Sequence, residues 1–593
     1  MRQKKLGLIA SALACLALAA SGSAIAQSAP PAPTRPNIVV IVIDDAGFTD
    51  LGAYGGEART PNIDSLARRG AQFSRYYSSP LCSPSRAMLL SGMDNHRTGH
   101  ATIIEVLPPE LRGRPGYTMR LEPGVTTLAT RLRDGGYRTY ATGKWHLGHG
   151  EGDLPNSHGF DRSFVLDASG ADNWEQRPYM PYYRTADWFE DGARATLPEN
   201  FYSSAFIVDR MIQYLDGDTA RGEAPFFAYL AFQAVHIPVQ APREYTANYR
   251  GRYDAGWEEL RTARWRRAQE LGLLPADAGI DATPHGFRPW RSLSSEDQAI
   301  YARSMEVHAG MLEAMDHNIG RLIAHLQARG LADNTIFVVT SDNGPEPSLP
   351  TAEPDFVRWM GLQGYTRRME DLGERGSFVF IGPEFANATA TGALYKFTSG
   401  EGGLHVPFIM AGPGIAAQRV NARAFVTDVA PTLLERAGVP LAAPAMDGLS
   451  LNPVLSGAAT EVRDANTPLG VEVSGHSALY RGDYKLVRTP PPLGANSWRL
   501  YDIARDPGET TDLAAAMPDL VQTMLADYEA YADRVGVLDL PPGYDVQRQV
   551  VHNVRMKQLE MYWWVLAIAA AVLIGVIALI IWGMRRLFRK RAA

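Results

Sequence analysis

The feature that most constrains the fold is an unbroken apolar segment, Asn37–Ile43, in which six consecutive residues are isoleucine or valine. Such a run of β-branched residues is typical of a strand buried on both faces of a parallel or mixed sheet. The segments Thr335–Thr340 and Pro225–Phe232 have the same character, and a long amphipathic helix is expected across Glu296–Ala328. Strands that alternate with helices predict an α/β fold in which a large mixed sheet is sandwiched between helices.

Polar residues follow two of these predicted strands. Asp44 and Asp45 come after the first strand, and Asp342 and Asn343 come after the segment Thr335–Thr340. Because sites in open α/β sheets form at the carboxyl ends of strands, the two pairs are expected to converge on one cation. An all-oxygen ligand set favours a hard ion, Ca²⁺ or Mg²⁺, over zinc. Each pair alone also fits the simpler interpretation that Asp and Asn begin turns.

One cysteine, Cys82, is expected in the mature protein. The other, Cys15, lies in an N-terminal segment that is predicted to be cleaved, so an internal disulfide cannot form. Pro84 suits the first turn of a helix, which places Cys82 at an anion-attracting helix N-terminus with Arg86 one turn further on. This arrangement indicates chemistry on a negatively charged group. The alternative is a buried free cysteine that packs as a small apolar residue.

The segment Leu81–Arg86, Leu-Cys-Ser-Pro-Ser-Arg, resembles the signature of the type I sulfatases, which are formylglycine-dependent members of the alkaline phosphatase superfamily. The resemblance extends from about residue 36 to about residue 537 and is closest to bacterial arylsulfatases. Further matches lie at Asn37–Asp45, Gly143–His146, Thr340–Gly344, Glu401–Gly403, Ala241–Glu244 and Tyr249–Gly256. The resemblance implies the sulfatase fold, with a small C-terminal subdomain made of an antiparallel sheet and a helix.

The resemblance also implies a nucleophile and a metal site. In this family the cysteine at the position of Cys82 is oxidised by a formylglycine-generating enzyme, and one hydroxyl of the hydrated aldehyde attacks sulfur. One divalent cation is expected, with calcium favoured and magnesium as the alternative. Its implied ligands are Asp44, Asp45, Asp342, Asn343 and the modified residue at position 82.

Five basic side chains complete the implied site. Arg86 is expected to orient the nucleophile. Lys144 is expected to bind sulfate and His146 to hold or deprotonate the nucleophile, and in an extended segment these two side chains point to the same side. His236 and Lys396 match the family histidine and lysine that contact sulfate and the leaving oxygen.

The two ends of the chain lie outside the resemblance. Residues 1–26 have the charged start, apolar run and Ala-x-Ala site of a secretory signal, and the Pro- and Ala-rich residues 27–35 are predicted to be a disordered lead-in. The remaining chain divides into a catalytic α/β domain at 36–460, a C-terminal α+β subdomain at 461–539 and a juxtamembrane linker at 540–560.

A transmembrane helix is predicted at residues 561–584, which are uncharged and almost wholly apolar. At about 1.5 Å per residue this helix spans roughly 36 Å, enough to cross a bilayer. Aromatic residues flank it, and the basic residues 585–593 are expected to form a cytoplasmic tail. Signal and anchor together predict an exported protein that is held in the lipid bilayer by one helix, with its catalytic domain on the periplasmic or extracytoplasmic side.

The predicted function is hydrolysis of a small-molecule sulfate monoester to an alcohol or phenol and sulfate. An alternative is hydrolysis of phosphonate monoesters or phosphodiesters, because sulfur and phosphorus centres of similar size suit the same fold. A less favoured alternative is an inactive membrane-tethered binding protein. The net charge of −6 gives no basic field for a nucleic-acid partner.

Two features remain open at the level of sequence. The aromatic segment Trp174–Trp188 fits either a wall for an apolar leaving group or ordinary packing. His405 stands where the family commonly has arginine, and the sequence does not predict what this change does.

Overall fold

The computed structural model describes residues 35–217, 224–282, 284, 286–392, 394–441 and 443–591. The predicted signal and all but the last residue of the lead-in lie outside this part of the chain. The largest sheet has ten strands in the order β11-β2-β10-β9-β1-β8-β4-β5-β6-β7. These strands are β1 (Asn37–Ile43), β2 (Ala71–Phe73), β4 (Arg138–Lys144), β5 (Arg162–Leu166), β6 (Trp188–Glu190), β7 (Ala193–Arg194), β8 (Phe226–Ala231), β9 (Thr335–Ser341), β10 (Phe408–Ala411) and β11 (Gln418–Val420).

The centre of this sheet is parallel. Strand β1 pairs in parallel with β8 and with β9, and β4 pairs in parallel with β8 and with β5. Strand β10 runs antiparallel to β9, and β6 runs antiparallel to β5, so the sheet as a whole is mixed. The predicted large mixed sheet is therefore confirmed, and its buried centre is the Ile- and Val-rich strand from which the prediction began.

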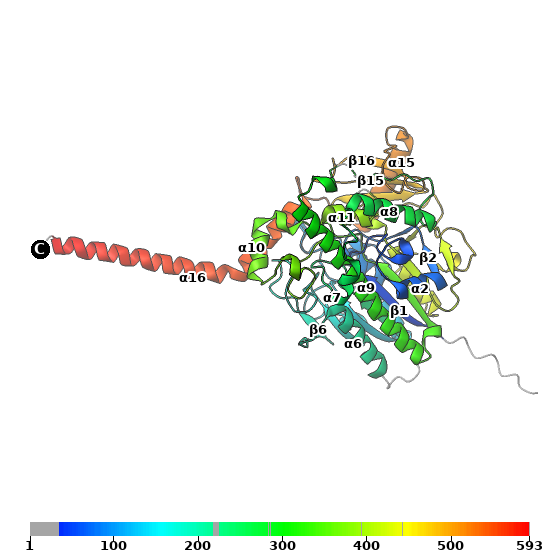
Figure 1. The fold of residues 1–593 in the computed structure, drawn as a ribbon, viewed down its shortest axis with the longest axis horizontal. Coiled ribbons are helices and arrows are strands. Elements are labelled where there is room, and N and C mark those ends of the chain that lie inside the picture. Colours follow the sequence, from blue (N-terminus) through cyan, green and yellow to red (C-terminus); the bar gives the residue numbers. More distant parts are fainter. Residues whose placement is uncertain are drawn as a thin grey trace, which may run out of the picture. The chain divides into compact units, whose positions relative to one another are not determined.

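Helices cover both faces of the sheet because the side chains of its strands alternate between two cores. In β1, Val39 and Ile41 face one core while Val40 and Val42 face the other. Figure 1 shows α9 lying across the sheet with α2 and α6 beside it. The first core is covered by α2 (Pro61–Arg69), α6 (Ser203–Gly217), α8 (Trp257–Glu270) and α9 (Ser295–Ala328), and the second by α3 (Cys82–Ser91), α5 (Leu128–Asp134) and α13 (Val429–Arg436).

A small antiparallel sheet follows, as the sequence predicts. Its strands are β13 (Leu469–Val473), β14 (His476–Arg481), β15 (Tyr484–Arg488) and β16 (Trp498–Asp502), in that order. Helix α15 (Pro518–Val535) packs on the sheet through a core that includes Leu479, Leu486 and Met524.

The last helix, α16 (Val546–Arg591), begins inside the stretch that the sequence analysis treats as a linker. No glycine or proline interrupts residues 546–560, so nothing in the sequence breaks the helix before its apolar part. The portion Val546–Arg586 is long and apolar enough to cross a membrane. Its first turns pack against the main domain, where Val550 and Val554 contact the larger core.

Candidate active site

Four neighbouring parallel strands end at the same edge of the large sheet, and each delivers polar residues there. Asp44 and Asp45 follow β1, Asp342 and Asn343 follow β9, Lys144 ends β4, and His236 lies five residues beyond β8. The carboxyl ends of adjacent parallel strands are where sites form in such sheets. Cys82 reaches this edge as the first residue of α3, at the helix N-terminus that its sequence predicts.

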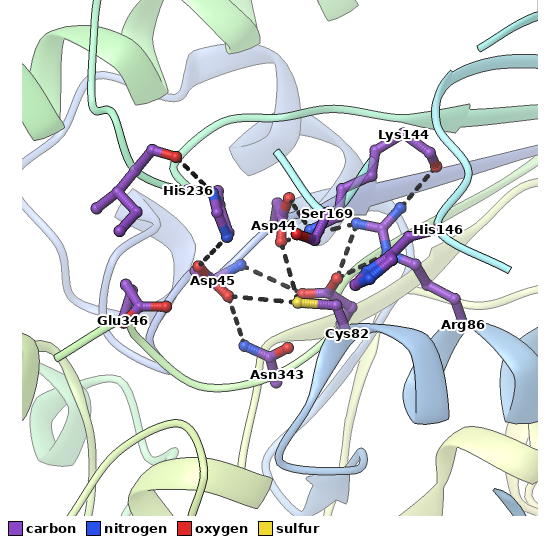
Figure 2. A network of polar contacts seen from close by, with 12 residues as sticks. Asp44, Asp45, Cys82, Arg86, Lys144, His146, Ser169, His236, Asn343 and Glu346 are labelled. Atoms are coloured by element: carbon purple, nitrogen blue, oxygen red, sulfur yellow. Dashed lines mark hydrogen bonds and ion pairs between the residues drawn. The ribbon is translucent and has the colours of Figure 1, made fainter. Parts of the chain in front are cut away.

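The oxygen-rich side chains form a tight cluster around Cys82 (Figure 2). One ligand atom from each of Asp44, Asp45, Cys82 and Asp342 lies within 4.8 Å of the others. The Cys82 Sγ atom is 3.7 Å from Asp44 Oδ1 and 4.0 Å from Asp45 Oδ1. Asn343 donates from Nδ2 to Asp45 Oδ1 at 2.7 Å, whereas its buried Oδ1 has no hydrogen-bond partner among the described residues. The carboxylate oxygens and the free amide oxygen of this cluster are the kind of ligand that a hard divalent cation such as Ca²⁺ or Mg²⁺ prefers.

Three buried basic side chains pair with these acids. Lys144 Nζ lies 2.6 Å from Asp44 Oδ2, and Arg86 Nε donates to Asp342 Oδ2 at 2.8 Å. Lys396 Nζ lies 2.8 Å from Asp45 Oδ1, and it also contacts the Glu346 carboxylate at 2.9 Å. Pairs buried this deeply contribute little net stability, because both partners lose their hydration, so the cluster indicates a functional site.

The charge balance of the cluster favours a bound cation. Four carboxylates face three basic side chains here. Burial raises the pKa of the Asp44 carboxyl to about 8 although the Lys144 ammonium lowers it, and the nearby Asp342 and Asp45 carboxylates raise it further. A divalent cation at this position would relieve that repulsion and would hold Asp44 in its ionised form.

The thiol and the two histidines are uncharged in this environment. Burial raises the pKa of the Cys82 thiol well above its ordinary value. Burial and the Lys144 ammonium lower the pKa of both His146 and His236 well below the usual range. His236 Nδ1 lies 2.6 Å from the Ile237 carbonyl, which assigns the proton to Nδ1 and leaves Nε2 as an acceptor.

The structure brings together all the site residues that the sequence predicts, with one difference in local geometry. Strand β4 ends at Lys144, and His146 has a left-handed backbone with φ of 55°, so the two residues do not share one extended segment. His146 nevertheless lies in the same network, close to Cys82 and Arg86 (Figure 2). Both of its buried ring nitrogens lack a hydrogen-bond partner within the described part of the chain.

Two residues of the network are absent from the sequence analysis. Glu346 pairs with Lys396, and Ser169, which donates to Glu105 Oε1, is among the residues labelled in Figure 2. Glu346 had a usable signal, since it lies four residues after Asp342 in the loop that follows β9. Ser169 had none, because a single serine after β5 does not differ from many others.

The structure gives His405 a packing role beneath the site. Its Nε2 atom lies 2.8 Å from the Ser74 carbonyl, and its ring packs on Phe48 with centroids 4.0 Å apart. Burial lowers the pKa of His405 to about 4, so the ring is neutral. The nearby Glu401 forms an ion pair with Lys485 in β15, with 2.9 Å between Glu401 Oε1 and Lys485 Nζ.

The aromatic segment 174–188 divides between the two interpretations that the sequence leaves open. Trp188 is fully buried in the core, where it packs between Phe164 and Phe201. Tyr179 instead packs edge-on against His236, with ring centroids 4.8 Å apart. Only part of the segment therefore reaches the site.

Comparisons with known proteins agree with this geometry. The sulfatase family model matches residues 36–439, and the model for the C-terminal region of N-sulphoglucosamine sulphohydrolase matches residues 395–528. An uncharacterized sulfatase of Schizosaccharomyces pombe is 34% identical over 86% of this chain and 96% of its own length. An arylsulfatase of Klebsiella aerogenes is 36% identical over 68% of this chain and 87% of its own length.

Solved structures share the fold at lower identity. Ps i-CgsB in complex with k-i-k-neocarrahexaose superimposes with a TM-score of 0.60 at 22% identity, covering 88% of this chain and 98% of that one. A protein in complex with its substrate D-glucosamine-2-N,6-O-disulfate gives a TM-score of 0.57 at 22% identity, covering 85% and 99%. From the matched family model and the relatives over nearly their full length, the chain belongs to the sulfatase family and is a sulfatase enzyme.

Proposed function

We propose that the protein hydrolyses sulfate monoesters of the arylsulfatase type, with a nucleophile supplied by formylglycine formed from Cys82. The observation that carries this proposal is the position of Cys82, which lies at the convergence of four strand ends among buried acids and bases. An unmodified thiol at this position remains protonated, because burial raises its pKa. A geminal diol supplies a hydroxyl for attack on sulfur and a second one for release of sulfate.

We assign the cation site to Asp44, Asp45, Asp342 and Asn343, with calcium as the favoured ion. The distances among these side chains and the free Oδ1 of Asn343 support the assignment. A cation held there supplies positive charge to the sulfate oxygens and favours the ionised nucleophile. The all-oxygen donor set supports calcium or magnesium over zinc.

The basic side chains hold the two reacting groups in place. Arg86 bonds both to Asp342 and to the Lys144 carbonyl, so it fixes the end of β4 relative to the acids. Lys144 is a sulfate-binding cation, and His146 with its neutral ring accepts or holds the proton of the nucleophile. These roles agree with the burial of both side chains and with the neutral ring of His146.

We assign His236 and Lys396 to contacts with the leaving oxygen. Burial works against the charge of Lys396, but the Asp45, Cys82 and Glu346 groups outweigh it and raise its pKa well above the ordinary value. Lys396 therefore carries a proton that it can share with the departing oxygen. The neutral His236 has its Nε2 directed toward Asp45, at 3.8 Å from Oδ2, on the same side of the cluster.

Modification must precede folding, because Cys82 is 2% exposed and every residue of α3 is buried. A formylglycine-generating enzyme therefore acts on the unfolded segment, before or during export. We further propose that α16 anchors the protein in the membrane through residues 561–584 and that the catalytic domain lies on the extracytoplasmic side.

The decisive experiment is peptide mass spectrometry of the segment around residue 82 together with kinetics on the purified full-length protein. We expect a mass about 18 Da below that of cysteine, or its hydrate, and turnover of 4-nitrophenyl sulfate that Cys82→Ala abolishes. A bis(4-nitrophenyl) phosphate substrate and a phosphonate monoester serve as the matched comparison. A strong phosphonate preference with negligible sulfate turnover, or full activity with an unmodified thiol, would contradict the proposal.

A further inference from the structure

A second buried polar cluster lies against the His236 side of the site, and the mechanism above does not use it. Its centre is Glu105, which is 2% exposed. Glu105 Oε1 accepts hydrogen bonds from the Ser169 hydroxyl at 2.5 Å and from the Tyr183 hydroxyl at 2.5 Å. The Tyr179 hydroxyl lies 2.9 Å from Ser169 Oγ. Glu105 Oε2 is buried without a hydrogen-bond partner in the described chain.

This cluster touches the active site at two points. The Tyr179 ring packs edge-on against His236, the residue that serves the leaving oxygen. Gly170, directly after Ser169, lies so close that a Cβ atom there would come within 2.7 Å of the His236 ring. The Glu105 cluster therefore lies on the side of the site where the alcohol or phenol half of the ester departs.

The hydrogen bonds of the cluster are unevenly shared between the two oxygens of Glu105. Burial, and then the charge of Glu105, raise the pKa of Tyr179 and Tyr183 well above the ordinary value, so both phenols stay protonated. Tyr183 and Ser169 give their hydrogens to Oε1, and Tyr179 can give its hydrogen to Ser169. Oε2 keeps all its lone pairs. Leaving such a buried oxygen without a donor is costly, which a ligand donor relieves.

We propose that Glu105 forms a leaving-group subsite that accepts a hydrogen bond from a hydroxyl group on the alcohol or phenol half of the substrate. This inference rests on the proposed function and predicts that, among its substrates, the enzyme prefers sulfate esters that carry a free hydroxyl close to the ester oxygen. Glu105 is then a specificity residue, since its interaction is made only with esters that carry the hydroxyl.

Residues just before and within the first turns of α16 hydrogen-bond to the backbone of the Glu105 loop. Asn553 Nδ2 donates to the carbonyls of both Glu105 and Leu107, each at 2.9 Å, and the Tyr544 hydroxyl donates to the Val106 carbonyl between them at 2.8 Å. Val550 packs in a small apolar cluster that includes Val106. Three consecutive carbonyls are thus fixed from one side, and the carboxylate at residue 105 is preorganised.

Two esters that differ in a single hydrogen-bond donor test the proposal. Catechol monosulfate carries a hydroxyl beside the ester oxygen, and 2-methoxyphenyl sulfate carries the methylated form. With full-length protein in detergent, Glu105→Met is expected to lower kcat/KM for catechol monosulfate at least about 10-fold more than for the methoxy ester. Glu105→Gln keeps the shape and can still bond to a hydroxyl through its amide, so it is expected to retain most of the preference.

The outcomes separate this inference from the proposed function. Hydrolysis of 4-nitrophenyl sulfate, which has no such hydroxyl, reports the function alone. Equal losses for both esters in Glu105→Met would overturn the subsite. If that variant does not fold, competitive inhibition of the unaltered enzyme decides: catechol is expected to bind about 10-fold more tightly than 2-methoxyphenol, and equal inhibition would refute the subsite.

Discussion

At the scale of single residues, the proposed proton donor Lys396 gives the most specific test of the mechanism. Lys396→Met removes the ammonium that shares its proton with the leaving oxygen, and proton supply of this kind contributes about 10²–10⁴-fold to a rate. We expect a loss of that size for alkyl sulfates and phenyl sulfates with basic leaving groups, and a much smaller loss for 4-nitrophenyl sulfate. The measurement is kcat/KM against the pKa of the leaving alcohol, which should become steeper in the variant.

The matched control is Lys557→Met, which removes a surface lysine on α16. Its plot is expected to superimpose on that of the unaltered protein. If Lys396→Met only shifts the plot downward and leaves the slope unchanged, Lys396 does not supply a proton to the leaving group.

At the scale of elements, α16 is expected to influence substrate choice from outside the reacting centre. Asn553→Ala removes both hydrogen bonds to the loop of Glu105. We expect KM for catechol monosulfate to rise about 3–10-fold, while kcat for 4-nitrophenyl sulfate stays unchanged, since only the subsite is loosened. Combined with Glu105→Met, Asn553→Ala should add little further loss, because the two residues act through one contact.

Lys557→Ala is the control for this prediction, because Lys557 lies one turn further along α16 and forms a surface ion pair with Glu560 at 3.0 Å. A similar rise in KM for Lys557→Ala, or losses that simply add in the double variant, would mean that Asn553 supports the fold in general.

The elements of the site differ in how well the sequence predicts them. The strand ends were predictable, because Asp44, Asp45, Asp342 and Asn343 sit beside apolar runs that mark buried strands. The subsite was not predictable, because Ser169 and Asn553 lie 64 and 448 residues from Glu105 in the chain, and none of the three has a local pattern. The docked start of α16 was missed for a related reason: its polar residues look like a solvated linker until Asn553 is seen to bond to carbonyls.

At the scale of the whole molecule, His96 links the main domain to the small sheet. Its ring nitrogens lie 2.8 Å from Glu472 in β13 and 3.3 Å from Asp94. Burial opposes its charge, but the hydrogen bonds to Asp94 and Glu472 prevail and raise the pKa of His96 to about 9. The pKa of His96 is higher in the folded protein than in the unfolded chain. The charged contacts of His96 therefore add about 3 kcal/mol to the free energy of unfolding below pH 6.5, and this contribution is lost as the pH rises through about 9.

The check is the midpoint of thermal unfolding of the unaltered protein and of His96→Gln between pH 6 and pH 10. We expect the unaltered protein to unfold at a clearly higher temperature at pH 6, and the two midpoints to converge toward pH 10. A difference that is constant across this range would show that His96 is not charged in the folded protein.

The continuity of α16 has a consequence for distance. From Asn553, which holds the Glu105 loop, to residue 561, where the apolar stretch begins, the chain is one uninterrupted helix. Eight residues at about 1.5 Å each make a rigid spacer of about 12 Å. With the apolar stretch in a bilayer, as proposed above, this rigid helix would fix the height of the Glu105 subsite above the lipid headgroups, and that height would change with the number of residues between Asn553 and residue 561.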